Sequence, residues 1–322
     1  MSQNDHQPDP TGPGSPLYQV LSDGVMLYTA LPVLVFAVAS EGGGQGVDDH
    51  DRVAGIHARG NVGLGDILDR LLNSADMVIG LVFAGDERPV VAHAIHELHR
   101  HIEGKLRDGS RYHAWNKDLW ALTWAGILKP IMTVYEELRG FESKAFRQDV
   151  YTGLLQLGEG FRVRGLPENY DDFQLYWQNT WLPAMQNHTQ AANFILEMAQ
   201  SPPRPMRSPW LPTPVWQAIT WPPRRLLWTG LLLAMPPEME TLLGIERTRG
   251  DHASIRVHRA FWRVLPRFVT GRLAERFFKL RFRYGSPAWR RHYSIESLKQ
   301  YRTAVKTAKA EGSALPERPS VR

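Results

Sequence analysis

Four histidines lie close together in the segment HAIHELHRHIEG, residues 93–104. His93, His96 and His99 are three residues apart, so on a helix they lie along one side, with His101 elsewhere. Two imidazoles and a carboxylate can form a non-haem metal site. The usual helical metal pair has i, i+4 spacing, as in H-E-x-x-H, and that motif is absent. The segment is therefore compatible with a non-haem metal site, with one axial haem ligand, or with a polar helix face.

A second polar group lies within the apolar stretch DILDRLLNSADMV, residues 66–78. Asn73 and Ser74 follow Arg70 by three and four residues, so one helix face offers a cation and two hydrogen-bonding groups. Such a face could pair with a carboxylate, anchor a haem propionate or orient bound dioxygen. The alternative is an intramolecular ion pair at the helix surface.

Composition limits the chemistry further. The chain of 322 residues has no cysteine, which excludes disulfides, thiolate nucleophiles, iron–sulfur clusters and thiolate-ligated haem. The glycine-rich stretch EGGGQG, residues 41–46, lacks both the dinucleotide-binding pattern and the P-loop lysine. No G-x-S-x-G motif of an α/β-hydrolase occurs. Any metal must therefore be held by His, carboxylate, Tyr or Met.

The elements that position these groups are predicted to be helices. The apolar run Val25–Ala39 is interrupted by Pro32 and is short for a membrane span, so we expect a buried helix ending near Ser40. EGGGQG should then break any helix, and residues 47–66 should form a loop. Apolar residues return at helical spacing from Ile67.

Helices are also expected on both sides of a turn at Asp108-Gly109. The first covers residues 89–103 with Gly104 just beyond its end, and the second covers residues 117–138, capped by Asn116. Pro130 should kink the second helix, and Ser143 should cap the next one. With no clear alternating strands, the class is mainly α, as a single all-helical domain.

Basic and aromatic residues are concentrated near the C-terminus. Residues 259–322 hold 16 Lys/Arg and 4 Asp/Glu, together with several phenylalanines. This region could contact an anionic membrane surface, or it could be a solvated helix face. No nucleic-acid-binding motif accompanies it, so we expect no nucleic-acid partner. We expect residues 1–16 to be a disordered lead, 17–305 the domain, and 306–322 a frayed basic tail.

An ordered series of stretches resembles one family. The series includes GPGSPLYQVLSDGVMLYTALP, GVDDHD, DILDRLLNSADMVIGLVFAGDERPV, HELHRHIEG, DGSRYHAWNKDLWALTWAGIL, YEELRG and VRGLPENYDDFQLYW. From about Gly12 to Trp289 it is similar to the catalytic domain shared by the mycophenolic-acid-pathway oxygenase MpaB and the latex clearing protein, a rubber oxygenase. The resemblance implies an all-helical fold with a haem pocket between helices. It also implies b-type haem and cleavage of isoprenoid double bonds with dioxygen.

The resemblance assigns roles to particular residues. The family's ligand helix matches residues 98–104, which makes His99 the proximal haem ligand. The rubber oxygenase's Arg-x-x-Lys-Thr motif is similar to residues 70–74, with Arg70 kept and Asn73 and Ser74 in place of Lys and Thr. We therefore predict Arg70, Asn73 and Ser74 as catalytic residues, with Arg70 also contacting the cofactor.

Two positions depart from the family pattern. Many members have His-Pro where this chain has Ser40-Glu41, and a His where it has Trp124. We expect Trp120 and Trp124 to line an apolar pocket instead.

The sequence thus predicts a haem b-dependent oxygenase that acts on a hydrophobic, isoprenoid- or lipid-like small molecule with dioxygen. A non-catalytic haem-binding or ligand-carrier protein, and a non-haem metalloenzyme using residues 93–101, are the alternatives. The absence of a signal peptide favours a cytoplasmic location, with the basic C-terminal region able to contact a membrane. The oligomeric state stays undetermined.

Overall fold

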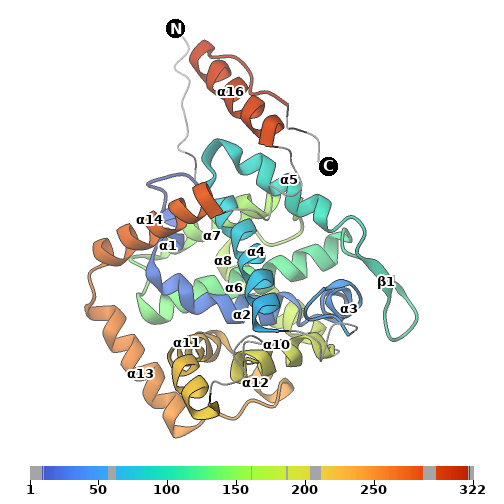
Figure 1. The fold of residues 1–322 in the computed structure, drawn as a ribbon, viewed down its shortest axis with the longest axis vertical. Coiled ribbons are helices and arrows are strands. Elements are labelled where there is room, and N and C mark those ends of the chain that lie inside the picture. Colours follow the sequence, from blue (N-terminus) through green and yellow to red (C-terminus); the bar gives the residue numbers. More distant parts are fainter. Residues whose placement is uncertain are drawn as a thin grey trace.

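The protein is described by a computed structural model that covers residues 9, 11–56, 63–160, 162–185, 188–203, 212–285, 295–317 and 319. Over these residues the fold is mainly α, as predicted, with one two-stranded hairpin (Figure 1). The helices, with η marking 3₁₀ or π turns, are α1 (Pro16–Leu21), η1 (Gly24–Thr29), α2 (Ala30–Ala37), α3 (Glu41–His50), α4 (Leu64–Phe83), η2 (Gly85–Glu87), α5 (Arg88–Leu98), α6 (Lys117–Leu138), α7 (Lys144–Gly160), α8 (Tyr170–Tyr176), η3 (Trp177–Trp181), α9 (Leu182–Ala184), α10 (Gln190–Gln200), α11 (Thr213–Ala234), α12 (Pro237–Leu242), α13 (Arg249–Val264), α14 (Arg267–Gly285) and α16 (Ile295–Glu311).

Helices α2 and α6 form the centre of the molecule (Figure 1). A β-carbon at Gly126 of α6 would lie 2.6 Å from the carbonyl oxygen of Phe36, so only glycine permits this close approach. Phe36 and Trp181 are fully buried beside each other, and Trp181 stacks on Trp177 with ring centroids 3.7 Å apart. Large aromatic side chains thus account for much of the core.

The first apolar run is buried, as expected, but it is not one helix. Residues 24–29 form a 3₁₀ turn and α2 ends at Ala37. Val25, Val35 and Phe36 are fully buried, which confirms the core assignment. Among the described helices none is long and apolar enough to cross a membrane alone. The bent pair 24–37 and 41–50, at 95°, meets the length and composition criteria only jointly.

The prediction that EGGGQG breaks any helix is wrong, because these residues form the first turns of α3. Ser40 caps the helix by accepting from the Gly43 N–H at 3.2 Å. A β-carbon at Gly44 would lie 2.1 Å from Thr189 Oγ1 and 2.8 Å from the carbonyl of Val38. The glycines therefore allow tight packing of the helix, and tertiary contacts offset their low helix propensity.

Helix α5 is shorter than predicted, since it ends at Leu98 rather than near Glu103. The chain then enters β1 (Glu103–Lys105), which pairs antiparallel with β2 (Arg111–His113). Gly104 lies in β1 opposite Tyr112. The prediction that it directly follows a helix end is therefore wrong. The predicted turn is confirmed, with Gly109 at a φ of 84°.

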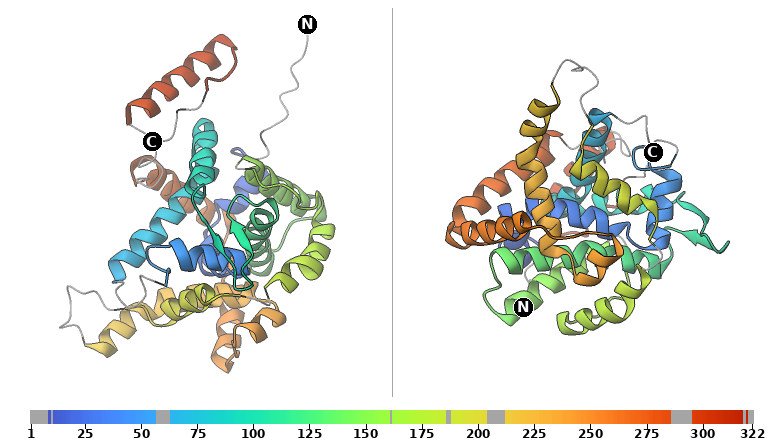
Figure 2. Two further views of the ribbon diagram at one scale, coloured as in Figure 1. Left: turned by 90° about the vertical axis from the view of Figure 1, so that its right-hand side faces the viewer. Right: turned by 90° about the horizontal axis from the view of Figure 1, so that it is seen from below.

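The later helices follow the predicted pattern more closely. Helix α6 covers residues 117–138 as expected, with Asn116 accepting from two backbone N–H groups, and it continues through Pro130. Ser143 accepts from the Phe146 N–H at 3.0 Å as α7 begins. Figure 2 shows α10 to α13 gathered at one end of the molecule.

The ends of the chain are more structured than expected where they are described. Thr11 is buried and its carbonyl accepts from Arg88 at 3.1 Å, although it falls in the expected disordered lead. Helix α16 continues to Glu311, inside the expected frayed tail, and buries Val305 and Ala308. Residues 1–8 and 10 of the lead, and 318 and 320–322 of the tail, lie outside the described residues.

Candidate functional site

His99 lies at the C-terminal end of α5 with a fixed ring orientation. Its Nδ1 is 2.7 Å from the carbonyl oxygen of Ile95, one turn earlier. A neutral imidazole carries one N–H, so this bond places the proton on Nδ1 and leaves the lone pair on Nε2. Burial lowers the pKa of His99, and the positive charges of Arg70 and His96 lower it further. His99 is thus a neutral imidazole that can bind a metal through Nε2.

Trp120 of α6 forms one wall beside this imidazole. Its ring meets the His99 ring edge-on, with centroids 4.8 Å apart and planes at 72°. The side chain is buried, so it shields one side of the imidazole from water. The structure therefore brings together two of the predicted site residues from helices separated by the hairpin.

The other three histidines of the segment differ from one another in burial, and His96 stacks on another ring. His96 is buried and stacks on Trp115, with centroids 4.2 Å apart and planes at 17°. His93 is half-buried, and His101 is exposed. Within the described residues no group of three or more His, Asp or Glu side chains could hold a metal ion. The four histidines therefore do not form a shared metal site there.

Arg70 of α4 is held by a carboxylate that the sequence did not single out. Its Nε donates to Asp51 Oδ2 at 2.7 Å, and its guanidinium also donates to Ser74 Oγ. Asp51 accepts in addition from the backbone N–H groups of Val53 and Ala54 at 2.8 and 2.9 Å. Burial would raise the pKa of Asp51, but Arg70 and the two N–H donors lower it overall. The charged pair therefore persists at neutral pH and fixes the guanidinium.

Asn73 points to a different group. Its Nδ2 donates to Asp69 Oδ2 at 3.1 Å, and Asp69 also pairs with Arg52 at 2.5 Å on the exposed surface. The structure thus joins Arg70 to Ser74 and separates Asn73 from both. Asp51 lies in the stretch GVDDHD. The sequence predicted that Arg70 could pair with a carboxylate, but it did not indicate which one.

The N-terminal half of α4 leaves apolar side chains uncovered. Leu68, Leu71 and Leu72 are 48%, 38% and 45% exposed on a helix whose later residues Leu81 and Val82 are buried. An amphipathic helix of a globular protein normally buries such residues. This part of α4 therefore offers apolar surface that a hydrophobic ligand could cover.

The two positions that depart from the family pattern have structural roles. Ser40 is buried and caps α3 through the Gly43 N–H. Trp124 is buried and its Nε1 donates to the carbonyl of Leu154 in α7 at 3.1 Å. Trp124 is thus part of the contact between α6 and α7, whereas Trp120 lies against His99.

One known family matches most of the chain. A sequence model described as "ER-bound oxygenase mpaB/B'/Rubber oxygenase, catalytic domain" matches residues 18–267, well over half of the chain. The chain belongs to this family. The family is an oxygenase catalytic domain, so its description supports oxygenase activity in general. Searches of curated proteins and of solved structures found no match.

Within this oxygenase family fold, the donor set at His99 suits a haem better than a bare metal ion. One neutral imidazole with its Nδ1 proton held by a backbone carbonyl is the arrangement that metal-ligating histidines adopt. A nearby guanidinium could contact a propionate, and a buried indole would cover a porphyrin edge. A haem needs only one protein ligand, so the single imidazole of His99 could hold it.

Proposed function

We propose that this chain is a haem b-dependent oxygenase acting on a hydrophobic, isoprenoid- or lipid-like small molecule. The observation that carries the proposal is the hydrogen bond from His99 Nδ1 to the carbonyl of Ile95, since it presents Nε2 as a ligand. Membership of the oxygenase family supports the reaction class. The exposed apolar residues of α4 offer a surface for a hydrophobic ligand.

Each residue would contribute one physical effect. His99 would hold the iron through Nε2, and the Ile95 carbonyl would keep the ring in one orientation. Arg70, fixed by Asp51, would pair with a propionate or polarise an oxygen atom, with Ser74 positioning its guanidinium. Trp120 would exclude water from one side. Bound haem supplies the dioxygen chemistry, while the protein orients the reactants. Asn73 stays a sequence-based prediction.

Haem analysis of the purified protein tests the cofactor directly. Protein from haem-replete cells should show a Soret band near roughly 400 nm, as expected for haem with a His ligand. His99→Ala should lose the haem, whereas His93→Ala and His101→Ala should retain it. A colourless wild-type protein would refute the haem proposal. Equal loss in all three variants would refute the choice of His99.

A non-catalytic haem-binding or ligand-carrier protein is the second candidate. One observation favours it: Ser40 and Trp124 stand where many family members have histidines. Here Ser40 caps α3, and Trp124 packs in the core and donates to the carbonyl of Leu154. Oxygen uptake with isoprenoid and lipid substrates separates the two functions. Substrate-dependent uptake by the haem-loaded protein supports the oxygenase, and its absence over a broad substrate panel supports the carrier.

A further inference from the structure

Helix α13 lies at the edge of the molecule (Figure 1) and carries an exposed strip of apolar side chains. Val257, Phe261 and Val264 are 64%, 53% and 83% exposed, and their i, i+4, i+7 spacing places them on one side of the helix. Phe268 follows in the first turn of α14 and is 66% exposed. Helix α13 buries its opposite side through Ile255 and Trp262, so the exposed strip is not part of the core.

An arginine row runs beside this apolar strip. Arg249, Arg256 and Arg263 are seven residues apart, so they form a second line along α13, about 80–120° around the helix axis from Val257. All three side chains are exposed, and none has an ion pair in the part of the chain that the structure describes. From Arg249 to Gly285 the sequence has ten Lys/Arg and two Asp/Glu. This surface therefore combines exposed apolar groups with three exposed arginines that have no ion pair among the described residues.

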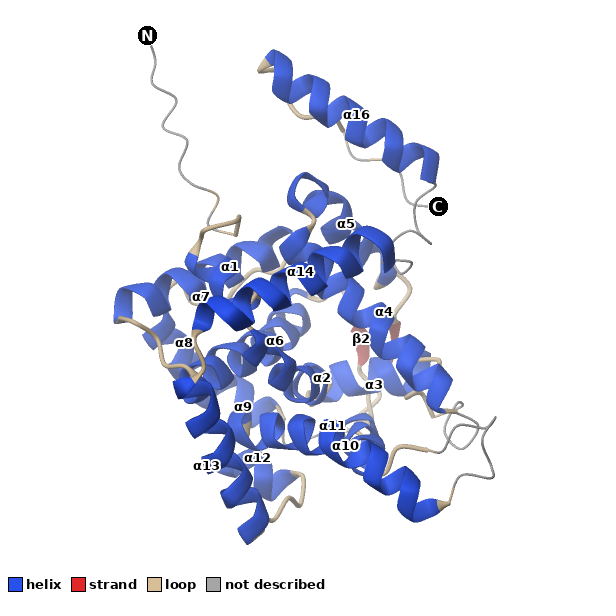
Figure 3. Ribbon diagram, turned by 60° about the vertical axis from the view of Figure 1, so that its left-hand side comes forward, coloured by secondary structure: helices blue, strands red, loops and turns tan. Residues whose placement is uncertain are grey.

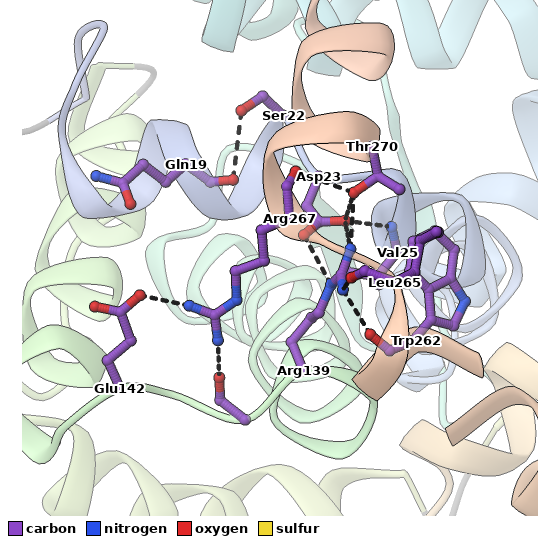
Figure 4. A network of polar contacts seen from close by, with 11 residues as sticks. Gln19, Ser22, Asp23, Val25, Arg139, Glu142, Trp262, Leu265, Arg267 and Thr270 are labelled. Carbon is purple, nitrogen blue, oxygen red and sulfur yellow. Dashed lines mark hydrogen bonds and ion pairs between the residues drawn. The ribbon is translucent and has the colours of Figure 1, made fainter. Parts of the chain in front are cut away.

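The corner between α13 and α14 is fixed rigidly to the core (Figure 4). Arg139, the residue directly after α6, is buried and pairs with buried Asp23 at 3.0 Å. Its guanidinium also donates to the carbonyls of Trp262 and Leu265 and to Thr270 Oγ1, so it joins the end of α13 to the start of α14. The exposed strip is thus presented by an anchored corner rather than by a loose helix.

We infer that the α13–α14 corner is a docking surface for an anionic phospholipid membrane. Exposed Phe261, Val264 and Phe268 would enter the interface between headgroups and acyl chains, and exposed arginines would bind the phosphates. The charge of this surface favours an anionic lipid surface and disfavours a second copy of the chain. Two copies would bring their arginine rows together, and like charges repel. Figure 3 shows α13 and α14 together on this side of the molecule.

Vesicle binding by the full-length protein tests this inference, independently of haem content. The protein should co-sediment with vesicles of phosphatidylcholine and phosphatidylserine, and much less with phosphatidylcholine alone. Because each cationic side chain at such a surface contributes about fivefold to binding, Arg256→Glu/Arg263→Glu should weaken it at least about 25-fold. The charge-matched control is Arg107→Glu/Arg111→Glu on the exposed β-hairpin, at the opposite side of the molecule in Figure 1. It should bind like the wild type.

A second variant separates the apolar contribution from charge. Phe261→Ser/Val264→Ser keeps the net charge and should also weaken binding, with far-UV circular dichroism confirming the fold. Equal binding to neutral and anionic vesicles, or an equal loss in the hairpin control, would overturn the inference. A second result would also overturn it: no vesicle binding, together with a dimer in sedimentation analysis that the two serine substitutions abolish. The strip would then join two copies of the chain.

Discussion

The buried pair of Arg139 and Asp23 should be one of the most sensitive points of the fold. The two side chains are 3% and 4% exposed, and Arg139 also satisfies the carbonyls of Trp262 and Leu265. Arg139→Met keeps an unbranched chain but removes every donor, which leaves Asp23 buried without its cation. Losing one partner of such a pair costs about 3–5 kcal/mol. That loss is a large part of a typical unfolding free energy of roughly 5–15 kcal/mol.

Arg267→Met is the matched control, because Arg267 lies in the same network (Figure 4) but is 40% exposed, and it pairs with Glu142, which is 58% exposed. A solvated pair of this kind contributes at most about 1 kcal/mol. Urea unfolding followed by circular dichroism should show the large loss only for Arg139→Met. Asp23→Asn in the Arg139→Met background should recover part of it, since the uncompensated charge is removed. A loss below about 1 kcal/mol for Arg139→Met would refute the reasoning.

Three further outcomes follow from local geometry and charge. Gly44→Ala should destabilise the protein in thermal unfolding, because its β-carbon would meet Thr189. The control Gly65→Ala has open space around it and should be neutral or stabilising by up to about 1 kcal/mol. In haem-free protein, lowering the pH through the window just below 6.5 should reduce stability more in the wild type than in His99→Gln, since the unfolded chain then binds a proton that folded His99, with its lowered pKa, does not. Lys129→Met should stabilise the protein more at pH 7 than at pH 10, because burial lowers the pKa of Lys129 to about 8 and burying its charged form is costly. Parallel pH profiles for variant and wild type would contradict either of the last two.

Much of the helical framework follows from sequence alone. Asn116, Ser143 and the Asp108-Gly109 turn mark boundaries correctly, because capping and turn formation depend on a few neighbouring residues. The EGGGQG segment could not be predicted in this way. Its helix depends on Ser40 as a cap and on space that only glycine leaves beside Thr189, which comes from a distant part of the chain.

The candidate site shows the same division. The sequence, read through its family resemblance, points to His99, Arg70 and Ser74, whose types and spacing carry the chemistry. It does not show that Asp51 holds Arg70, that Asn73 turns to Asp69, that Trp120 lies against the imidazole, or that Trp124 donates to Leu154.

The sequence by itself determined which residue types can act and the helices that carry them, because propensity and periodicity are local properties. Only the tertiary structure decided which of those side chains meet and which nitrogen of His99 is presented. It also left the α13 strip uncovered at an anchored corner. The physical reason is that burial, ion pairing and close packing depend on residues far apart in the chain.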